Sequence, residues 1–255
     1  MGCAEEPASA RIDASTLASP LLSPLIMEYR ARHPRDTVVL MTELAGGNAL
    51  VGITTGLADV SALTQELDDA ELRTLGLSRH AIARTALVFG VNPGVPVDSI
   101  TGQQLCDIYS GAIVNWRQLG GPDLPIKAGI PMPRDGDGGH PIAAVKCATG
   151  FRYGPHVQMI DPPAYMGDAI ATTAGGIGLT APGVLAQHPG RIKALSVDGV
   201  APTPDNIASG RYFLTRTTWL VTRAEPPRVV TRLLRFIRSR DGQRIIRENG
   251  AVPMN

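Results

Sequence analysis

Three segments of the sequence share a design that suits an anion: small residues form a turn that opens a predicted helix. Free backbone N–H groups of the first helical turn and the positive end of the helix dipole both attract negative charge. One such turn alone is a weak signal, because most glycine-rich turns are only turns. The three turns are Asp13–Leu17, Ala45–Asn48 and Arg134–His140.

The third turn adds a positive charge. The planar guanidinium of Arg134 presents a fork of N–H donors that suits bidentate contact with an oxyanion. A surface ion pair with Asp135 or Asp137 would account for Arg134 equally well. The residue by itself leaves both interpretations open.

Other chemistries lack their motifs. The chain has no phosphate-binding GxxxxGK loop, no GxGxxG after a strand, no GxSxG nucleophile turn, and neither HExxH nor CxxC. Asp135–Gly138 superficially suggests a calcium loop, but its twelfth position is Lys146 where the loop needs Glu. We therefore expect no metal, no cofactor and no catalytic residues.

Composition limits the class of protein. The 255 residues are 44% hydrophobic, enough for a substantial core, and no apolar stretch is long enough to span a membrane. The net charge is +1, which argues against nucleic acid or an anionic membrane as the main partner, since such binders usually carry clustered positive charge. The basic run Arg228–Arg247 is expected to be a solvated helix face, with contact to a transporter or partner as the second interpretation.

Hydrophobic periodicity predicts the elements that position the turns. The first 63 residues follow a strand–helix–strand–helix–strand order, which is typical of an α/β unit with a parallel sheet. Thr101 is a candidate N-cap for a later helix. The expected strands are 11–17, 37–41, 58–63, 86–91, 177–180, 191–197 and 218–222, and the expected helices are 21–32, 49–55, 101–110, 141–149, 164–173, 227 onward and 241–248.

The three cysteines leave two questions open. Cys106 and Cys147 could form a disulfide, but separate buried side chains are the favoured interpretation. Cys3 follows Gly2, as in the end of a bacterial lipobox, where the cysteine receives a lipid. An ordinary N-terminal tail or a cloning remnant explains residues 1–7 as well.

Residues 103–116 resemble a signature of one protein family. Their sequence, Gln-Gln-Leu-Cys-Asp-Ile-Tyr-Ser-Gly-Ala-Ile-Val-Asn-Trp, resembles the Leu-x-x-Ile-(Phe/Tyr)-x-Gly-x-Ile-x-x-Trp pattern of periplasmic phosphate-binding proteins of ABC transporters. Weaker segments match the family in the same order. They are 175–179, 199–203, 210–216, 239–243 and 249–253, so that the resemblance covers about residues 10–253.

The resemblance implies an α/β fold of the type II periplasmic-binding class, with two doubly wound lobes joined by two crossing strands. The crossings would lie near Val88–Val91 and Trp219–Val221. Lobe one would take residues 8–90 plus 217–255, and lobe two would take 91–216. Residues 1–7 would form a disordered tail, serving as a linker if Cys3 carries a lipid.

The resemblance also implies which residues bind the ligand. The family holds dehydrated phosphate with three helix-opening turns, an Arg and an Asp. Since a carboxylate can only accept hydrogen bonds, the Asp selects a protonated oxyanion and disfavours sulfate. The matching positions are Thr16 and Leu17 in the first turn, Gly46 and Gly47 in the second, Arg134, Gly138, Gly139 and His140 in the third, and Asp59 as the carboxylate.

The chain departs from the family at three hydroxyl donors. Gly46 replaces a Ser, and Gly138-Gly139-His140 replaces Ser-Gly-Thr. At roughly 0.5–1.5 kcal/mol per hydrogen bond, the loss would weaken phosphate binding on the order of 10²–10³-fold. A protonated His140 would compensate, although it could equally cap a helix or face solvent. The glycines would also leave room for an organophosphate or a phosphonate.

The sequence therefore predicts a periplasmic or cell-surface solute-binding protein that captures phosphate or a related oxyanion by lobe closure. Its second partner would be an ABC permease, and it would reach a membrane only through a lipid on Cys3. The alternative is a sensor or interaction protein of the same fold whose ligand has changed or been lost. An enzyme on this fold is disfavoured, because no nucleophile or His/Asp constellation is present.

Overall fold

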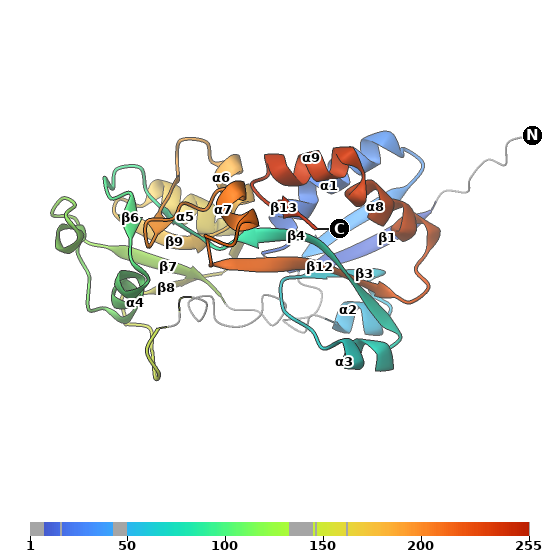
Figure 1. The fold of residues 1–255 in the computed structure, drawn as a ribbon, viewed down its shortest axis with the longest axis horizontal. Helices are drawn as coiled ribbons and strands as arrows, with labels where there is room; N and C mark the ends of the chain where they lie inside the picture. Colours follow the sequence, from blue (N-terminus) through green and yellow to red (C-terminus); the bar gives the residue numbers. More distant parts are fainter. Residues whose placement is uncertain are drawn as a thin grey trace, which may run out of the picture. The chain divides into compact units, whose positions relative to one another are not determined.

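Apolar strands near the N-terminus form the first of three sheets in the computed structural model (Figure 1), which describes residues 8–15, 17–42, 50–132, 145, 147–161 and 163–254. The described residues fall into two compact units. One takes 8–84 and 217–254, and the other takes 85–132 and 145–216. The first boundary between the units, after residue 84, lies six residues before the expected lobe boundary after residue 90. The second boundary, after residue 216, is at the expected position.

The first unit contains a six-stranded sheet. Its three parallel strands are β1 (Ser9–Ala14), β2 (Thr37–Thr42) and β3 (Val60–Leu63), with β1 in the middle. The antiparallel strand β12 (Thr215–Arg223) pairs with β3. The last two strands are β4 (Leu77–Ala86) and β13 (Val252–Pro253). The order of strands across the sheet is β13-β4-β12-β3-β1-β2.

Three helices cover one face of this sheet. They are α1 (Ser19–Arg32), α8 (Arg228–Arg238) and α9 (Arg240–Glu248), which contact one another and lie together in Figure 1. Alternate residues of β1, namely Ala10, Ile12 and Ala14, face these helices and are buried with them in one core. The period-two pattern of the strand and the apolar stripes of the helices meet here, as expected for helices packed on a sheet.

A buried ion pair ties α8 to the turn after α1. Arg232 Nη2 lies 2.6 Å from Asp36 Oδ1, and the Tyr29 hydroxyl donates a hydrogen bond to the same carboxylate. Burial, together with the Asp36 carboxylate, raises the pKa of Tyr29 to about 12. Burial alone would raise the pKa of Asp36, but the hydrogen bonds from Arg232 and Tyr29 outweigh it and lower the pKa.

Short helices follow β2 and β3 in the first unit. Leu50 and Ile53, at the start of and within α2 (Val51–Thr54), share a small core with Leu72 of α3 (Asp69–Thr74). The Asp68 side chain caps α3 by accepting from Ala70 N and Glu71 N. Helix α2 connects β2 to β3, and α3 connects β3 to β4.

The second unit has a five-stranded sheet in the order β10-β5-β9-β7-β8. Its parallel part is β9 (Gly176–Thr180), β7 (Lys127–Pro131) and β8 (Gln158–Ile160). The antiparallel part is β5 (Val88–Val91) and β10 (Lys193–Ala194). The remaining elements are β6 (Ser99–Ile100) paired with β11 (Ser196–Val197), the helices α4 (Gly102–Ser110), α5 (Met166–Thr172), α6 (Pro182–Gln187) and α7 (Pro204–Ala208), and the 3₁₀ turns Trp116–Leu119 and Pro163–Tyr165.

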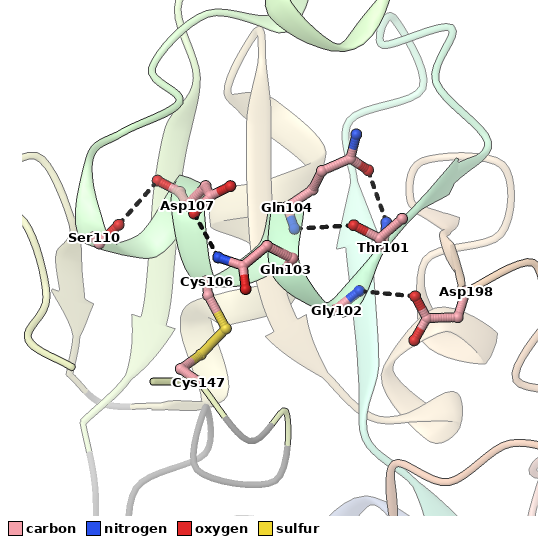
Figure 2. The surroundings of a disulfide bond; sticks show 9 residues. All are labelled: Thr101, Gly102, Gln103, Gln104, Cys106, Asp107, Ser110, Cys147 and Asp198. Carbon is pink, nitrogen blue, oxygen red and sulfur yellow. Dashed lines mark hydrogen bonds between the residues drawn. A yellow bond between two sulfur atoms is a disulfide. The ribbon is translucent and has the colours of Figure 1, made fainter. Parts of the chain in front are cut away.

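Helix α4 begins as the sequence predicts. Thr101 is its N-cap, and a capping box forms with Gln104: Gln104 N donates to Thr101 Oγ1, and Thr101 N donates to Gln104 Oε1. Gly102 N, one of the free amides of the first turn, donates to Asp198 Oδ1 at 3.0 Å. Figure 2 shows these contacts.

The favoured interpretation of two separate cysteines is wrong. Cys106 and Cys147 form a disulfide that joins α4 to the segment after residue 146, with a Cα–Cα distance of 5.6 Å (Figure 2). The two residues are 41 positions apart, so no local pattern indicates the pairing. The folding of α4 against that segment brings them together.

The chain passes between the two units close to the expected strand crossings. Val88–Val91 lies within the second sheet, where β5 pairs with β9 and β10, and Trp219–Val221 pairs with β3 in the first sheet. The chain passes between units earlier, within β4 at residues 84 and 85, and returns at 216 and 217, near the start of β12. The helix expected at 141–149 lies mostly outside the described residues.

Candidate functional site

The carboxyl ends of β1, β2 and β3 lie at one edge of the first sheet, because the three strands are parallel. In open α/β sheets, ligands bind outside this edge. The first predicted turn, Asp13–Leu17, follows β1 there and leads into α1. The topology therefore places the first turn where an anion site of this fold class is expected.

Backbone hydrogen bonds hold the first turn against the sheet. Ser15 N donates to Ala62 O of β3 at 2.7 Å, and Ser15 O accepts from Ala18 N and Ser19 N. Ala18 is the N-cap of α1 and supplies no side-chain cap, and proline occupies the first turn of the helix. Among the described residues, no side-chain cap therefore forms at the positive end of α1. Leu17 is half-buried in this turn, and Thr16 lies outside the described residues.

Asp59 is at the other end of the sheet. It directly precedes β3, and the register places it beside Arg11 of β1. Asp59 Oδ2 accepts from Arg11 N at 2.8 Å and lies 3.5 Å from Arg11 Nε. At about 3.3 Å per residue, some 16 Å of strand separates Asp59 from Thr64 at the carboxyl edge. The structure does not bring Asp59 together with the first turn, which corrects the expectation that both contact one ligand.

Two hydroxyls that the sequence interpretation missed lie at the carboxyl edge instead. Thr64 follows β3 directly and is 4% exposed, and Ser15 follows β1. The Ser15 Oγ atom is buried and has no hydrogen-bond partner in the described part of the chain. A hydroxyl can both donate and accept, unlike a carboxylate. Position was a usable signal for Thr64, which comes immediately after the predicted strand 58–63, but not for Ser15, which falls within the predicted strand 11–17.

A buried carboxylate lies beneath α2. Asp13 of β1 is 9% exposed and stands beside Ser61 in the strand register. A Cβ atom built on Gly52 of α2 would lie 3.0 Å from Asp13 Oδ2. Gly52 therefore allows α2 to pack closely against the end of β1.

The other two turns lie outside the described residues. Gly46 and Gly47 fall between the end of β2 and the start of α2, and Arg134, Gly138, Gly139 and His140 fall between β7 and Val145. By chain position, each of these turns follows the carboxyl end of a parallel strand, as the first turn does. Cys147, held by the disulfide, comes seven residues after His140.

The second unit has its own buried hydroxyl at the equivalent edge. Thr180 ends β9, is 3% exposed, and its Oγ1 atom has no hydrogen-bond partner among the described residues. The parallel register of β7 and β9 places Thr180 level with Pro131, where β7 ends. Thr180 thus lies at the strand edge from which the Arg134 turn departs.

The described residues show no metal site and no membrane helix. They contain no group of three His, Cys, Asp or Glu side chains that could hold a metal ion. In the same part of the chain, no helix is both long and apolar enough to cross a bilayer. The first turn and the strand-end hydroxyls of the described residues offer hydrogen-bond donors that suit an anion.

Known proteins match the chain along nearly its whole length. A family described as the PBP superfamily domain matches residues 3–241. The chain is 28% identical over 252 residues to the phosphate-binding protein PstS of Bacillus subtilis, a match covering 96% of this chain and 81% of that protein. It is 24% identical over 249 residues to PstS of Borreliella burgdorferi, covering 94% and 88%.

A solved structure gives the same fold. It is that of a putative phosphate ABC transporter substrate-binding protein from Clostridium perfringens with bound phosphate, with a TM-score of 0.82 and 23% identity. The match covers 97% of this chain and 100% of that one.

Two α/β units, between which the chain passes twice, define the type II periplasmic-binding fold. The chain belongs to the PBP superfamily domain family. The resemblance to phosphate-binding proteins of ABC transporters, seen first in residues 103–116, is confirmed by the two relatives, both named as binding proteins.

Proposed function

We propose that the protein is an extracytoplasmic receptor that captures phosphate and delivers it to an ABC permease. The observation that carries this proposal is the match with PstS of Bacillus subtilis over 96% of the chain. The fold shared with a phosphate-bound structure supports it. The Cys106–Cys147 disulfide supports a location outside the cytoplasm, because structural disulfides persist in oxidising compartments.

In the proposed site, backbone N–H groups of three turns donate to the phosphate oxygens. The first turn lies between β1 and α1, where Ala18 supplies no side-chain cap and the helix dipole favours an anion. Arg134 gives charge-assisted hydrogen bonds, and closure of the two lobes removes the ligand from water. The contributing residues are Thr16, Leu17, Gly46, Gly47, Arg134, Gly138, Gly139 and His140, joined by the strand-end hydroxyls of Ser15 and Thr64.

Two further parts of the proposal concern a lipid anchor and the pH dependence of phosphate binding. A lipid on Cys3 would hold the receptor at the membrane through residues 4–7. His140, when protonated, would replace donors that the glycines lack, since the unperturbed pKa of histidine is about 6.5. Binding of phosphate would then strengthen below that pH.

Isothermal titration calorimetry with inorganic phosphate tests the proposal, at pH 5.5 and pH 8, on protein dialysed free of phosphate. We expect a micromolar or tighter dissociation constant, weakened about 100-fold by Arg134→Ala, since a charge-assisted hydrogen bond contributes roughly 1.5–3 kcal/mol. Arg152→Ala, an exposed arginine of the second unit, is the matched control and should bind as the wild type does. No heat from a folded wild type, or equal binding by Arg134→Ala, would refute it.

A further inference from the structure

The outer surface of α1, α8 and α9 is an arginine layer. Eight exposed arginines lie on these three helices, which pack side by side on one face of the first sheet. Only three acidic side chains accompany them, Glu28, Asp241 and Glu248, so that the layer carries a net charge of +5. The arginines are Arg30, Arg32, Arg228, Arg235, Arg238, Arg240, Arg244 and Arg247.

The acidic side chains of the layer neutralise only two of these arginines. Arg32 pairs with Glu28 and Asp241, at 2.7 and 2.6 Å. Arg244 pairs with Glu248 at 2.8 Å and lies 3.8 Å from Asp241. The other six arginines have no carboxylate partner in the described part of the chain. Of these, Arg238 contacts His80 and Arg247 contacts Gln243, both uncharged partners in neutral solution.

Five of the eight arginines lie in the last turns of the helices, where the dipole favours a cation: Arg30, Arg32, Arg235, Arg238 and Arg247. The remaining positions do not serve the stability of the helices. Arg228 and Arg240 are the first residues of α8 and α9, where the helix dipole disfavours a cation. Arg240, Arg244 and Arg247 form a stripe of like charges at i, i+4 and i+7, a spacing that also destabilises a helix. The structural arginine of α8 is a different one, Arg232, which faces inward onto Asp36.

The arginine layer carries more positive charge than the whole chain. The net charge of +1 argued against an anionic membrane, because binders of such surfaces usually carry clustered positive charge. The fold produces that cluster on one helical layer, and the remainder of the chain is correspondingly acidic. This surface therefore suits an anionic partner.

We propose that the arginine layer binds the anionic phospholipid headgroups of a bilayer surface. The cations of the layer are all arginines, and the guanidinium fork matches phosphate oxygens bidentately. The charges are spread over three adjacent helices, which suits a surface of many mobile anions better than one acidic protein loop. Met27 of α1, 71% exposed among these arginines, supplies an apolar side chain for the headgroup region.

Vesicle co-sedimentation tests the proposal. The probes are phosphatidylcholine vesicles with and without 30% phosphatidylglycerol, at low and high salt. We expect binding only with phosphatidylglycerol, reduced by salt because exposed charges are screened. The triple variant R228E/R235E/R240E should bind about 100-fold more weakly, because three positive charges that attract the anionic surface are reversed. Glutamate at the starts of α8 and α9 complements the helix dipoles, so this variant should remain folded.

The matched control is R152E/R191E/R211E, which changes the net charge equally on exposed arginines of the second unit. It should bind vesicles as the wild type does. Equal weakening in both triple variants would mean that total charge, and not the arginine layer, drives binding, and would overturn the proposal. Binding to soluble polyglutamate but not to the vesicles would overturn it in favour of an acidic protein. Phosphate affinity should be unchanged in both variants, which keeps this test separate from that of the ligand site.

Discussion

The disulfide between Cys106 and Cys147 allows a quantitative prediction. It closes a loop with a sequence separation of 41 residues. In the chain-entropy model, a loop of that length restricts the unfolded state by about 4 kcal/mol at 25 °C. We expect the double variant Cys106→Ser with Cys147→Ser to lose about that amount of unfolding free energy. Both cysteines lie on the second unit, so the loss should appear in the transition of that unit.

Urea unfolding followed by circular dichroism measures this loss, with Cys3→Ser as the matched control that removes a thiol outside the disulfide. Wild-type protein treated with a reductant should unfold at the midpoint of the double variant. A difference below about 1 kcal/mol between oxidised wild type and double variant would refute the entropic reasoning. Two extra free thiols in the untreated wild type, counted by alkylation and mass spectrometry, would refute the disulfide itself.

Two further variants test particular side chains. Asp59→Ala should leave phosphate affinity within about threefold, because Asp59 is at the amino edge of the sheet. The variant should lose about 1 kcal/mol of unfolding free energy, because Asp59 accepts a hydrogen bond from Arg11 N. A 100-fold loss of phosphate affinity in calorimetry would contradict this placement. Asp36→Asn should cost about 3 kcal/mol at pH 7 by removing the buried carboxylate that pairs with Arg232. Because the folded state lowers the pKa of Asp36, its contribution is present above about pH 4 and is lost as the pH falls through the lowered pKa, so the difference between wild type and variant in urea unfolding should shrink steadily below pH 4.

Elements with strong local signals were predictable from the sequence. Helix α1 was expected from the spacing of Leu21, Leu22, Leu25, Ile26 and Tyr29, all of which are buried. Helix α4 was expected to begin after Thr101, and its capping box confirms this. In both cases the residues that decide the structure lie within one or two turns of each other.

Features set by distant parts of the chain were not predictable. Strand β4 was missed because Ser78, Arg79 and His80 interrupt its apolar pattern. The segment is a strand because it pairs with its neighbours in the first sheet. The disulfide joins residues 41 apart. The basic run Arg228–Arg247 was visible in the sequence, but the packing of its helices beside α1, which ends nearly 200 residues earlier, was not. A sum such as the net charge cannot show such a cluster.

Asp59 shows why a matching order of residue types does not fix a site. The expectation placed its carboxylate on the ligand, yet the chain enters β3 after Asp59, so the residue belongs to the amino edge. An aspartate five positions later, at residue 64, would lie at the carboxyl edge of the sheet. The residue that is there, Thr64, carries a hydroxyl.

This exchange changes the expected selectivity. A carboxylate on the ligand would reject fully deprotonated oxyanions, whereas the hydroxyls of Ser15 and Thr64 can donate to them as well as accept from protonated ones. We therefore expect sulfate to compete with phosphate within about tenfold in displacement calorimetry. A preference for phosphate above about 1,000-fold would mean that a carboxylate does reach the ligand. Asp13, the buried acid on the strand that ends at the first turn, would then be the residue to replace by Asn, because it lies one residue before the carboxyl end of β1.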